Sequence, residues 1–204
     1  MTHLTNKSAC LIASISICMI FIVEMSHAVA DWKWQNPLPN GNYIEDIWVF
    51  PNNQIIAVGN AGTIIQFNGT QWVTMDSGVT VDLEAIWAIS PDNVYAAGAK
   101  GTILRFHNNQ WVQEQHTSQD NFTDIWGIND TIYVVGKNVM ILGQNTSLIP
   151  ENLLNGVQLN GIYGSSEKDI FAVGDKGTII HYDGTQWTRS ACPTQKKSQR
   201  HLGQ

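Results

Sequence analysis

Acidic side chains are the groups in this sequence that could most readily carry chemistry. A glycoside hydrolase needs two carboxylates that face each other across a cleft, and the candidates are Asp46, Glu84, Asp124 and Asp169. These residues recur at similar places in an internal repeat, near the starts of expected strands and in turns. Turn capping recurs in this way, whereas a catalytic pair is usually unique. We therefore expect no catalytic residues, and a glycan-active enzyme, or the degenerate remnant of one, is the alternative.

The histidine residues do not have the spacing of a metal site. His107, His116 and His181 are scattered along the chain, without the short intervals that join the ligands of a zinc site. A calcium-binding loop is also missing from the sequence. We predict neither a metal nor a cofactor.

A repeated unit of almost forty residues must position any functional side chain. An apolar-aromatic pair recurs at steps of 39, 39 and 37 residues, and a glycine after the second expected strand recurs at steps of 39, 38 and 38. Several features that hold one period indicate a structural array. The repeated positions are the aromatic residues Trp48, Trp87, Trp126 and Tyr163, the glycines Gly59, Gly98, Gly136 and Gly174, and the later tryptophans Trp72, Trp111 and Trp187.

The sequence pattern predicts four short strands in each unit. In the most regular copy, from Gly161 to Trp187, apolar runs are separated by turn residues about every eight positions. Asp183-Gly184 predicts a two-residue type I′ hairpin turn. Four strands in roughly 40 residues are typical of a β-propeller blade. We therefore predict an all-β array of about four four-stranded antiparallel blades, which need not form a complete ring, with units at about 35–72, 73–111, 112–150 and 151–189. A solenoid is the lesser alternative.

The first thirty residues have the pattern of a secretory signal peptide. Lys7 precedes an apolar run from Ala9 to Val23, and Ala28-Val29-Ala30 forms a small-residue cleavage site. We expect a secreted or periplasmic protein with no membrane span after cleavage, and an uncleaved anchor is the alternative. Cleavage would leave Cys192 as the one cysteine, so no internal disulfide could form.

The net charge disfavours two kinds of partner. Between Asp31 and Arg189 there are seven Lys and Arg residues against sixteen Asp and Glu residues. An acidic surface repels the phosphate backbone of nucleic acids and the head groups of anionic lipids. We expect neither nucleic acid nor a membrane surface as a partner.

The segment FAVGDKGTIIHYDGTQW, residues 171–187, resembles the repeats of secreted bacterial BNR-type propeller proteins. It is also similar to the repeats of the Ycf48-like photosystem II assembly factors. The resemblance covers nearly all of residues 32–187 and implies a ring of six to eight blades. The resemblance to BNR-type repeats implies sialidase as a candidate activity, and the carboxylate-binding site of sialidases contains three arginines. Residues 31–189 contain only Arg105 and Arg189, which argues against sialidase chemistry.

These observations favour a binding or assembly module outside the cytoplasm, without catalytic activity, whose partner is a protein or a glycan. Photosystem II assembly is a further alternative that the resemblance implies. The third unit is degenerate, because Asn138-Val139 replaces the usual Gly-Thr pair, and a binding edge could lie there. An uncapped fourth blade could also self-associate through its exposed edge. The candidate binding residues are Trp32, Trp34, Asn138 and Asn145.

The last residues, 190–204, are basic and lack the repeat. The regular interval places the next Ile-Trp pair at positions 201 and 202, where His201 and Leu202 stand. A shift of one base in the codons of residues 200–203 permits Asp-Ile-Trp-Gly, the sequence of residues 124–127. We hypothesise that a frameshift follows Trp187. The +1 frame of the nucleotide sequence should then encode a fifth unit, and a +1 frame without the repeat would refute the hypothesis.

Overall fold

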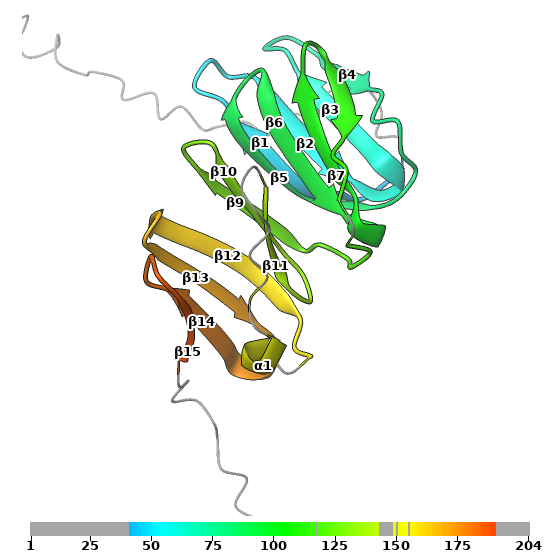
Figure 1. Cartoon of the computed structure of the whole chain (residues 1–204). Helices are drawn as coiled ribbons and strands as arrows, with labels where there is room; N and C mark the ends of the chain where they lie inside the picture. The colour runs from blue at the N-terminus through cyan, green and yellow to red at the C-terminus, as the bar shows by residue number, and fades with distance from the viewer. Residues whose placement is uncertain (1–40, 117, 143–148, 150, 155, 191–204) are drawn as a thin grey trace, which may run out of the picture. The chain divides into compact units, whose positions relative to one another are not determined.

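The computed structural model describes residues 41–116, 118–142, 149, 151–154 and 156–190, which form four antiparallel sheets (Figure 1). The first sheet contains β1 (Ile44–Val49), β2 (Ile55–Gly59), β3 (Thr63–Phe67) and β4 (Trp72–Met75), and the second contains β5 (Leu83–Ser90), β6 (Asn93–Gly98), β7 (Ile103–His107) and β8 (Gln110–Gln113). The third contains β9 (Asp124–Ile128), β10 (Thr131–Val135) and β11 (Val139–Leu142), and the fourth contains β12 (Leu159–Ser166), β13 (Asp169–Gly174), β14 (Thr178–Tyr182) and β15 (Trp187–Ser190).

The predicted all-β array of about four blades is confirmed. Each sheet is a meander in which consecutive strands pair, and three sheets have four strands. The third sheet differs from the prediction, because it has three strands among the described residues, and one helical turn, α1 (Glu151–Leu154), precedes β12. The first two units were expected to end at residues 72 and 111. These positions lie in β4 and β8, so the first sheet continues to Met75 and the second to Gln113.

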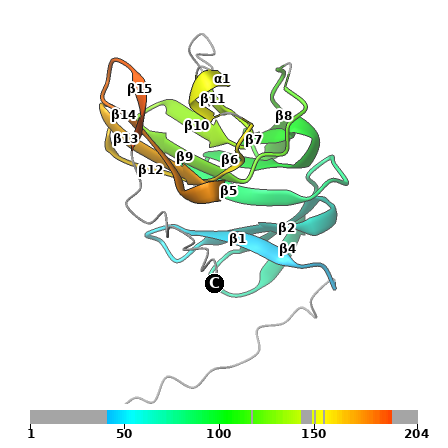
Figure 2. The same cartoon turned by 90° about the horizontal axis from the view of Figure 1, so that it is seen from below.

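Apolar side chains fill the spaces between successive sheets. The first strands β1, β5, β9 and β12 follow one another in space, each next to the first strand of the following sheet (Figure 2). Strand residues alternate between the two faces of a sheet. The second and third sheets each lie between two other sheets, so they bury side chains on both faces. Fully buried examples are Ile56 and Ile64 in the first sheet, Leu104 in the second and Ile170 in the fourth. Burying a side chain of this size contributes roughly 1.5–3 kcal/mol to stability.

The glycine at the end of the second strand, or directly after it in the third sheet, makes room for a backbone carbonyl. A Cβ atom at Gly59, Gly98, Gly136 or Gly174 would lie 2.0–2.3 Å from the carbonyl oxygen of a residue just before the first strand of the same sheet. In three sheets the residue after this glycine donates its N–H to that carbonyl, as Ala99 N does to the Asp82 oxygen at 2.9 Å. A side chain at this position would therefore displace the first strand.

A tight turn follows this glycine and links one sheet to the next. The turns η1 (Asn60–Gly62), η2 (Ala99–Gly101) and η3 (Asp175–Gly177) each hold a non-glycine residue at positive φ followed by a glycine at positive φ. Ala61 N donates to Asp82 Oδ1 just before the second sheet at 2.9 Å, and Lys100 N donates to Asn121 Oδ1 just before the third sheet at 2.9 Å. The turn thus fixes the position of its neighbour.

Two aspartates join first strands across neighbouring sheets. Asp46 Oδ2 accepts a hydrogen bond from Ile86 N at 2.8 Å, and Asp124 Oδ2 accepts one from Ile162 N at 2.7 Å. Burial raises the pKa of Asp124, against the opposing effect of its hydrogen bonds from Ile162 N and Ile125 N. These carboxylates are therefore occupied with main-chain groups.

The turn at Asp183-Gly184 is not the predicted type I′ turn. Gly184 has φ of +90°, but Asp183 is not among the residues with positive φ. The loop between β14 and β15 has four residues, and Asp183 Oδ1 accepts hydrogen bonds from Thr185 N at 2.8 Å, Thr185 Oγ1 at 2.6 Å and Gln186 N at 2.9 Å. These bonds lower the pKa of Asp183 to about 2. Asn68 Oδ1 accepts the same set in the first sheet.

Replacing Gly98 with alanine tests the role of the repeated glycine. The new Cβ would lie 2.1 Å from the backbone oxygen of Asp82, so we expect Gly98→Ala to lower the free energy of unfolding by about 1–3 kcal/mol. The control is Gly161→Ala, whose Cβ would meet its nearest atom at 3.4 Å and would match Ala85 of the second sheet. Denaturant unfolding of both variants measures the difference. Equal stabilities for the two variants would contradict this role.

Candidate functional site

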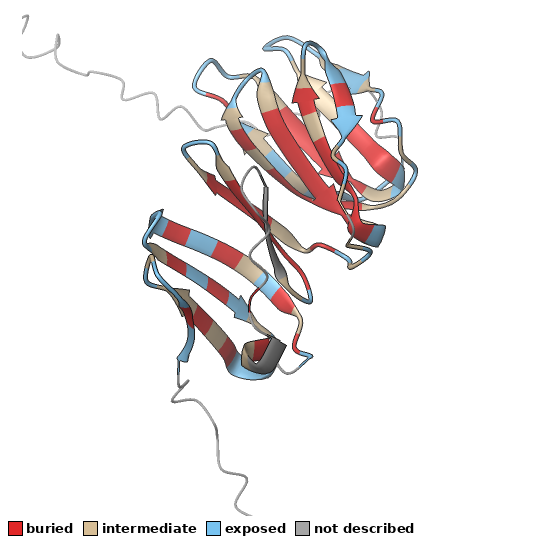
Figure 3. Cartoon of the chain, in the orientation of Figure 1, coloured by how far each residue is buried: buried red, intermediate tan, exposed pale blue. Residues whose placement is uncertain are grey.

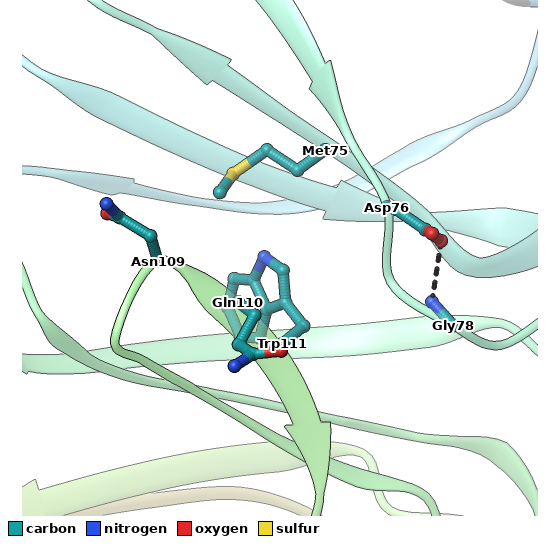
Figure 4. Close-up of a pocket in the computed structure, with 6 residues that line it drawn as sticks. All are labelled: Met75, Asp76, Gly78, Asn109, Gln110 and Trp111. Atoms are coloured by element: carbon teal, nitrogen blue, oxygen red, sulfur yellow. Dashed lines mark hydrogen bonds between the residues drawn. The ribbon is translucent and has the colours of Figure 1, made fainter.

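The candidate site is a pocket between the last strands of the first two sheets, with a volume of about 310 Å³. It is lined by Met75, Asp76 and Gly78 at and after the end of β4, and by Asn109, Gln110 and Trp111 at the start of β8 (Figure 4). The side chains of Met75 and Trp111 face each other across the pocket. Asn109 lies at one end of the pocket, and Asp76 and Gly78 lie at the other.

Local turn chemistry places the polar residues of the pocket. Asn108 and Asn109 both have positive φ, which is typical of a two-residue type I′ turn, and they join β7 to β8. Asp76 Oδ1 accepts a hydrogen bond from Gly78 N at 3.0 Å, and this bond holds the loop after β4. The side chains of Asp76, Asn109 and Gln110 are exposed at the rim. The rim therefore offers a carboxylate and two amides.

A buried donor without a partner lies in the wall of the pocket. Trp111 is 9% exposed, and its ring packs against Phe106 with centroids 5.3 Å apart. Its Nε1 atom is buried and has no hydrogen-bond partner among the residues that the structure describes. Within the described part of the chain, the other buried side-chain atom in this state is His107 Nδ1, in the same hairpin. An unsatisfied buried donor costs roughly 1–3 kcal/mol, and an acceptor in the pocket would remove that cost.

A row of aromatic rings crosses the four first strands. Centroids of Trp48 and Trp87 lie 4.6 Å apart, those of Trp87 and Trp126 6.2 Å, and those of Trp126 and Tyr163 6.1 Å. Gly164 accommodates this row, because a Cβ there would lie 2.6 Å from the Trp126 ring. The row packs sheet against sheet and ends at Tyr163, which is 70% exposed.

A serine, an aspartate and a histidine also meet on the fourth sheet. Asp169 accepts hydrogen bonds from Ser165 Oγ at 2.5 Å and from the His181 ring at 2.8 Å, and these bonds lower its pKa. In a nucleophilic triad the histidine must bond to the serine, whereas here the aspartate lies between them. This arrangement orients the histidine and does not activate the serine.

The other acidic candidates lie in structural positions. Glu84 is on β5, and burial together with the nearby charges of Glu45 and Asp82 raises its pKa. Among the described residues, no group of three or more His, Cys, Asp and Glu side chains is arranged to hold a metal ion. The same residues include no helix with the length and apolar character of a membrane span.

One of the four predicted binding residues can be placed. Asn138 is half-buried between β10 and β11, and its carbonyl accepts a hydrogen bond from Gly136 N at 2.9 Å. Trp32, Trp34 and Asn145 lie outside the described residues, as do the expected signal peptide and residues 191–204 of the basic tail, whereas Ser190 is the last residue of β15. The pocket was not predicted. Trp111 was recognised only as one of three equivalent tryptophans, and its unpaired Nε1 atom depends on packing that the repeat does not reveal.

Comparison with known proteins identifies the fold. No family model and no curated protein matches this sequence. YCF48 from Cyanidioschyzon merolae is similar in structure, with a TM-score of 0.60 at 14% identity over 78% of this chain and 63% of that chain. YCF48 bound to D1 peptide matches with a TM-score of 0.60 at 14% identity, over 79% of this chain and 57% of that one. The WD40 repeats of RRP9 match with a TM-score of 0.58 at 10% identity, over 72% and 51%.

This chain therefore spans less than two thirds of the length of these structures. All of these identities are low, so the likeness concerns the fold and carries no function across. The four sheets are repeats of the β-propeller type.

Proposed function

We propose that this chain is a binding module for a polypeptide, without catalytic activity, and that it works outside the cytoplasm. The observation that carries the proposal is Trp111, which lines a pocket of about 310 Å³ and whose buried Nε1 donor has no partner in the described part of the chain. A carbonyl or carboxylate oxygen of the ligand would accept its hydrogen bond. The pocket is at the small end of ligand sites, which run from roughly 300 to 1,000 Å³, so it suits one side chain of a longer ligand.

The surrounding strands favour a polypeptide. β4 and β8 are the last strands of their sheets, so among the described residues each has one side on which no strand of its sheet pairs. An extended peptide can add to such an edge through main-chain hydrogen bonds, while a nearby pocket takes a side chain. The structure of YCF48 bound to D1 peptide offers a precedent for peptide binding by a similar fold.

The rim residues define which peptides fit. The carboxylate of Asp76 lies at the rim, and the six described residues that line the pocket include no Lys or Arg. A basic or polar side chain would therefore be preferred over an acidic one. The location outside the cytoplasm is supported by the signal-peptide pattern of residues 1–30.

Replacing Trp111 with phenylalanine tests this proposal. The probe is a random-sequence peptide library displayed on phage, from which the wild-type chain selects ligands. Trp111→Phe keeps most of the ring but removes the N–H, so affinity for the selected peptides should fall about 2- to 10-fold, as expected for a net hydrogen bond of roughly 0.5–1.5 kcal/mol. Calorimetry on synthetic copies of those peptides measures the change.

Trp187→Phe is the matched control, because Trp187 holds the same place in the fourth sheet and packs on Tyr182 as Trp111 packs on Phe106. Its affinity should remain that of the wild type. Equal losses in both variants would contradict the pocket as the site. A glycan array with a hydrolysis assay covers the alternatives: retention of a glycan without peptide binding indicates a lectin, and turnover indicates an enzyme.

A further inference from the structure

The two terminal sheets each expose an apolar face. The leading face is defined by Ile47, Val49, Ile55, Ile65 and Phe67 of the first sheet, and Ile47 is 51% and Val49 59% exposed. The trailing face is defined by Tyr163, Phe171, Val173, Ile179 and His181 of the fourth sheet. Buried and exposed residues alternate along β12 and β13, so one face of this sheet packs on the third sheet while the other is open (Figure 3).

The trailing face is built like a face that another sheet covers. Strand register aligns its members with Trp87, Tyr95, Ala97, Ile103 and Arg105 of the second sheet. There Tyr95, Ala97 and Ile103 are buried against the third sheet in one core with Ile125, Ile132 and Val134. The trailing face thus has the composition of an inter-sheet contact.

A polar contact on this face repeats as well. In the second sheet, Arg105 Nε donates to Asn93 Oδ1 at 2.9 Å, and the guanidinium lies over the Tyr95 ring at 5.4 Å. At the same positions of the fourth sheet, the His181 ring bonds to Asp169 at 2.8 Å and stacks on Phe171 with centroids 4.1 Å apart. Different residues therefore preserve the same arrangement.

The leading face matches the opposite side of such a contact. Ile47 aligns with Ile86, Ile125 and Ile162, all of which are buried against the preceding sheet. Ile55 aligns in the same way with the buried residues Val94, Ile132 and Ile170, and Ile65 aligns with the buried residues Leu104 and Ile180. The leading and trailing faces are thus the two halves of one kind of contact.

The aspartates of the first strands agree with this pairing. Asp46 and Asp124 each reach the following sheet, while Ala85 and Gly161 stand at the equivalent positions of the second and fourth sheets. At the joint between the second and third sheets Ala85 offers no carboxylate, and Ile125 N donates to Asp124 Oδ1 at 2.8 Å instead.

Ile47 N donates to Asp46 Oδ1 at 2.7 Å in the same manner. A trailing face with Gly161 against a leading face with Ile47 would therefore reproduce the joint between the second and third sheets. Neither main-chain donor would lose a partner.

We propose that a second copy of this chain docks head to tail, with the leading face of one copy on the trailing face of the other. Two copies would bring together about eight sheets, within the usual range of roughly 4 to 8 blades for a β-propeller. In a closed pair, each copy uses both faces.

Sedimentation velocity of the full chain, expressed with its native N-terminal segment, tests this over a concentration series. We expect a species of twice the mass of the processed monomer. Ile47→Asp blocks the leading face and Val173→Asp blocks the trailing face, so each variant alone should sediment as a monomer. An equal mixture should recover the double mass, because one intact joint remains between the two variants.

The matched control is Val112→Asp, since Val112 is exposed on β8 and belongs to neither face. This control should associate like the wild type, and circular dichroism should show the same sheet content in all variants. A monomeric wild type at every concentration would overturn the proposal. So would a single-face variant that still pairs, because like faces would then be in contact, a mixture that stays monomeric, or a control that loses association.

Discussion

The structure depends on the packing of one sheet on the next through a repeated pair of faces. Each face has a fixed apolar pattern, and a backbone carbonyl against the glycine at the end of the second strand sets the position of the first strand. Because side chains alternate between faces, each sheet is stabilised on both sides only when it lies between two others. The second sheet illustrates this, since its faces contribute Leu104 to one core and Ile103 to another.

The packing of each sheet on its neighbours determines which side chains remain available for a function. Two of the acidic side chains that could carry chemistry, Asp46 and Asp124, instead accept hydrogen bonds from main-chain N–H groups of neighbouring sheets. The groups that this packing leaves available for binding lie at the outer strands and on the two terminal sheets. Trp111, whose buried indole N–H has no hydrogen-bond partner among the described residues, lines a pocket at the outer strands, and the two terminal faces keep the character of inter-sheet contacts.

Much of the fold could be predicted from the sequence because the same steric requirement returns in every unit. Gly59, Gly98, Gly136 and Gly174 hold their period since each meets a carbonyl oxygen where a Cβ would lie. The turn at Asp183 was predicted wrongly, because the Asp-Gly pair does not reveal that Thr185 and Gln186 donate to the carboxylate and lengthen the loop. The pocket could not be predicted, since an unpaired indole donor arises only from the packing of two sheets.

Residue-resolved amide hydrogen exchange tests the central claim most directly. At a concentration where the chain is monomeric, sheets covered on both faces should open less often than terminal sheets, because opening proceeds from the ends of an array. The account predicts slower exchange for the amides of β6 than for those of β2 and β13. Equal or faster exchange in β6 would contradict the claim that each sheet is held by its two neighbours.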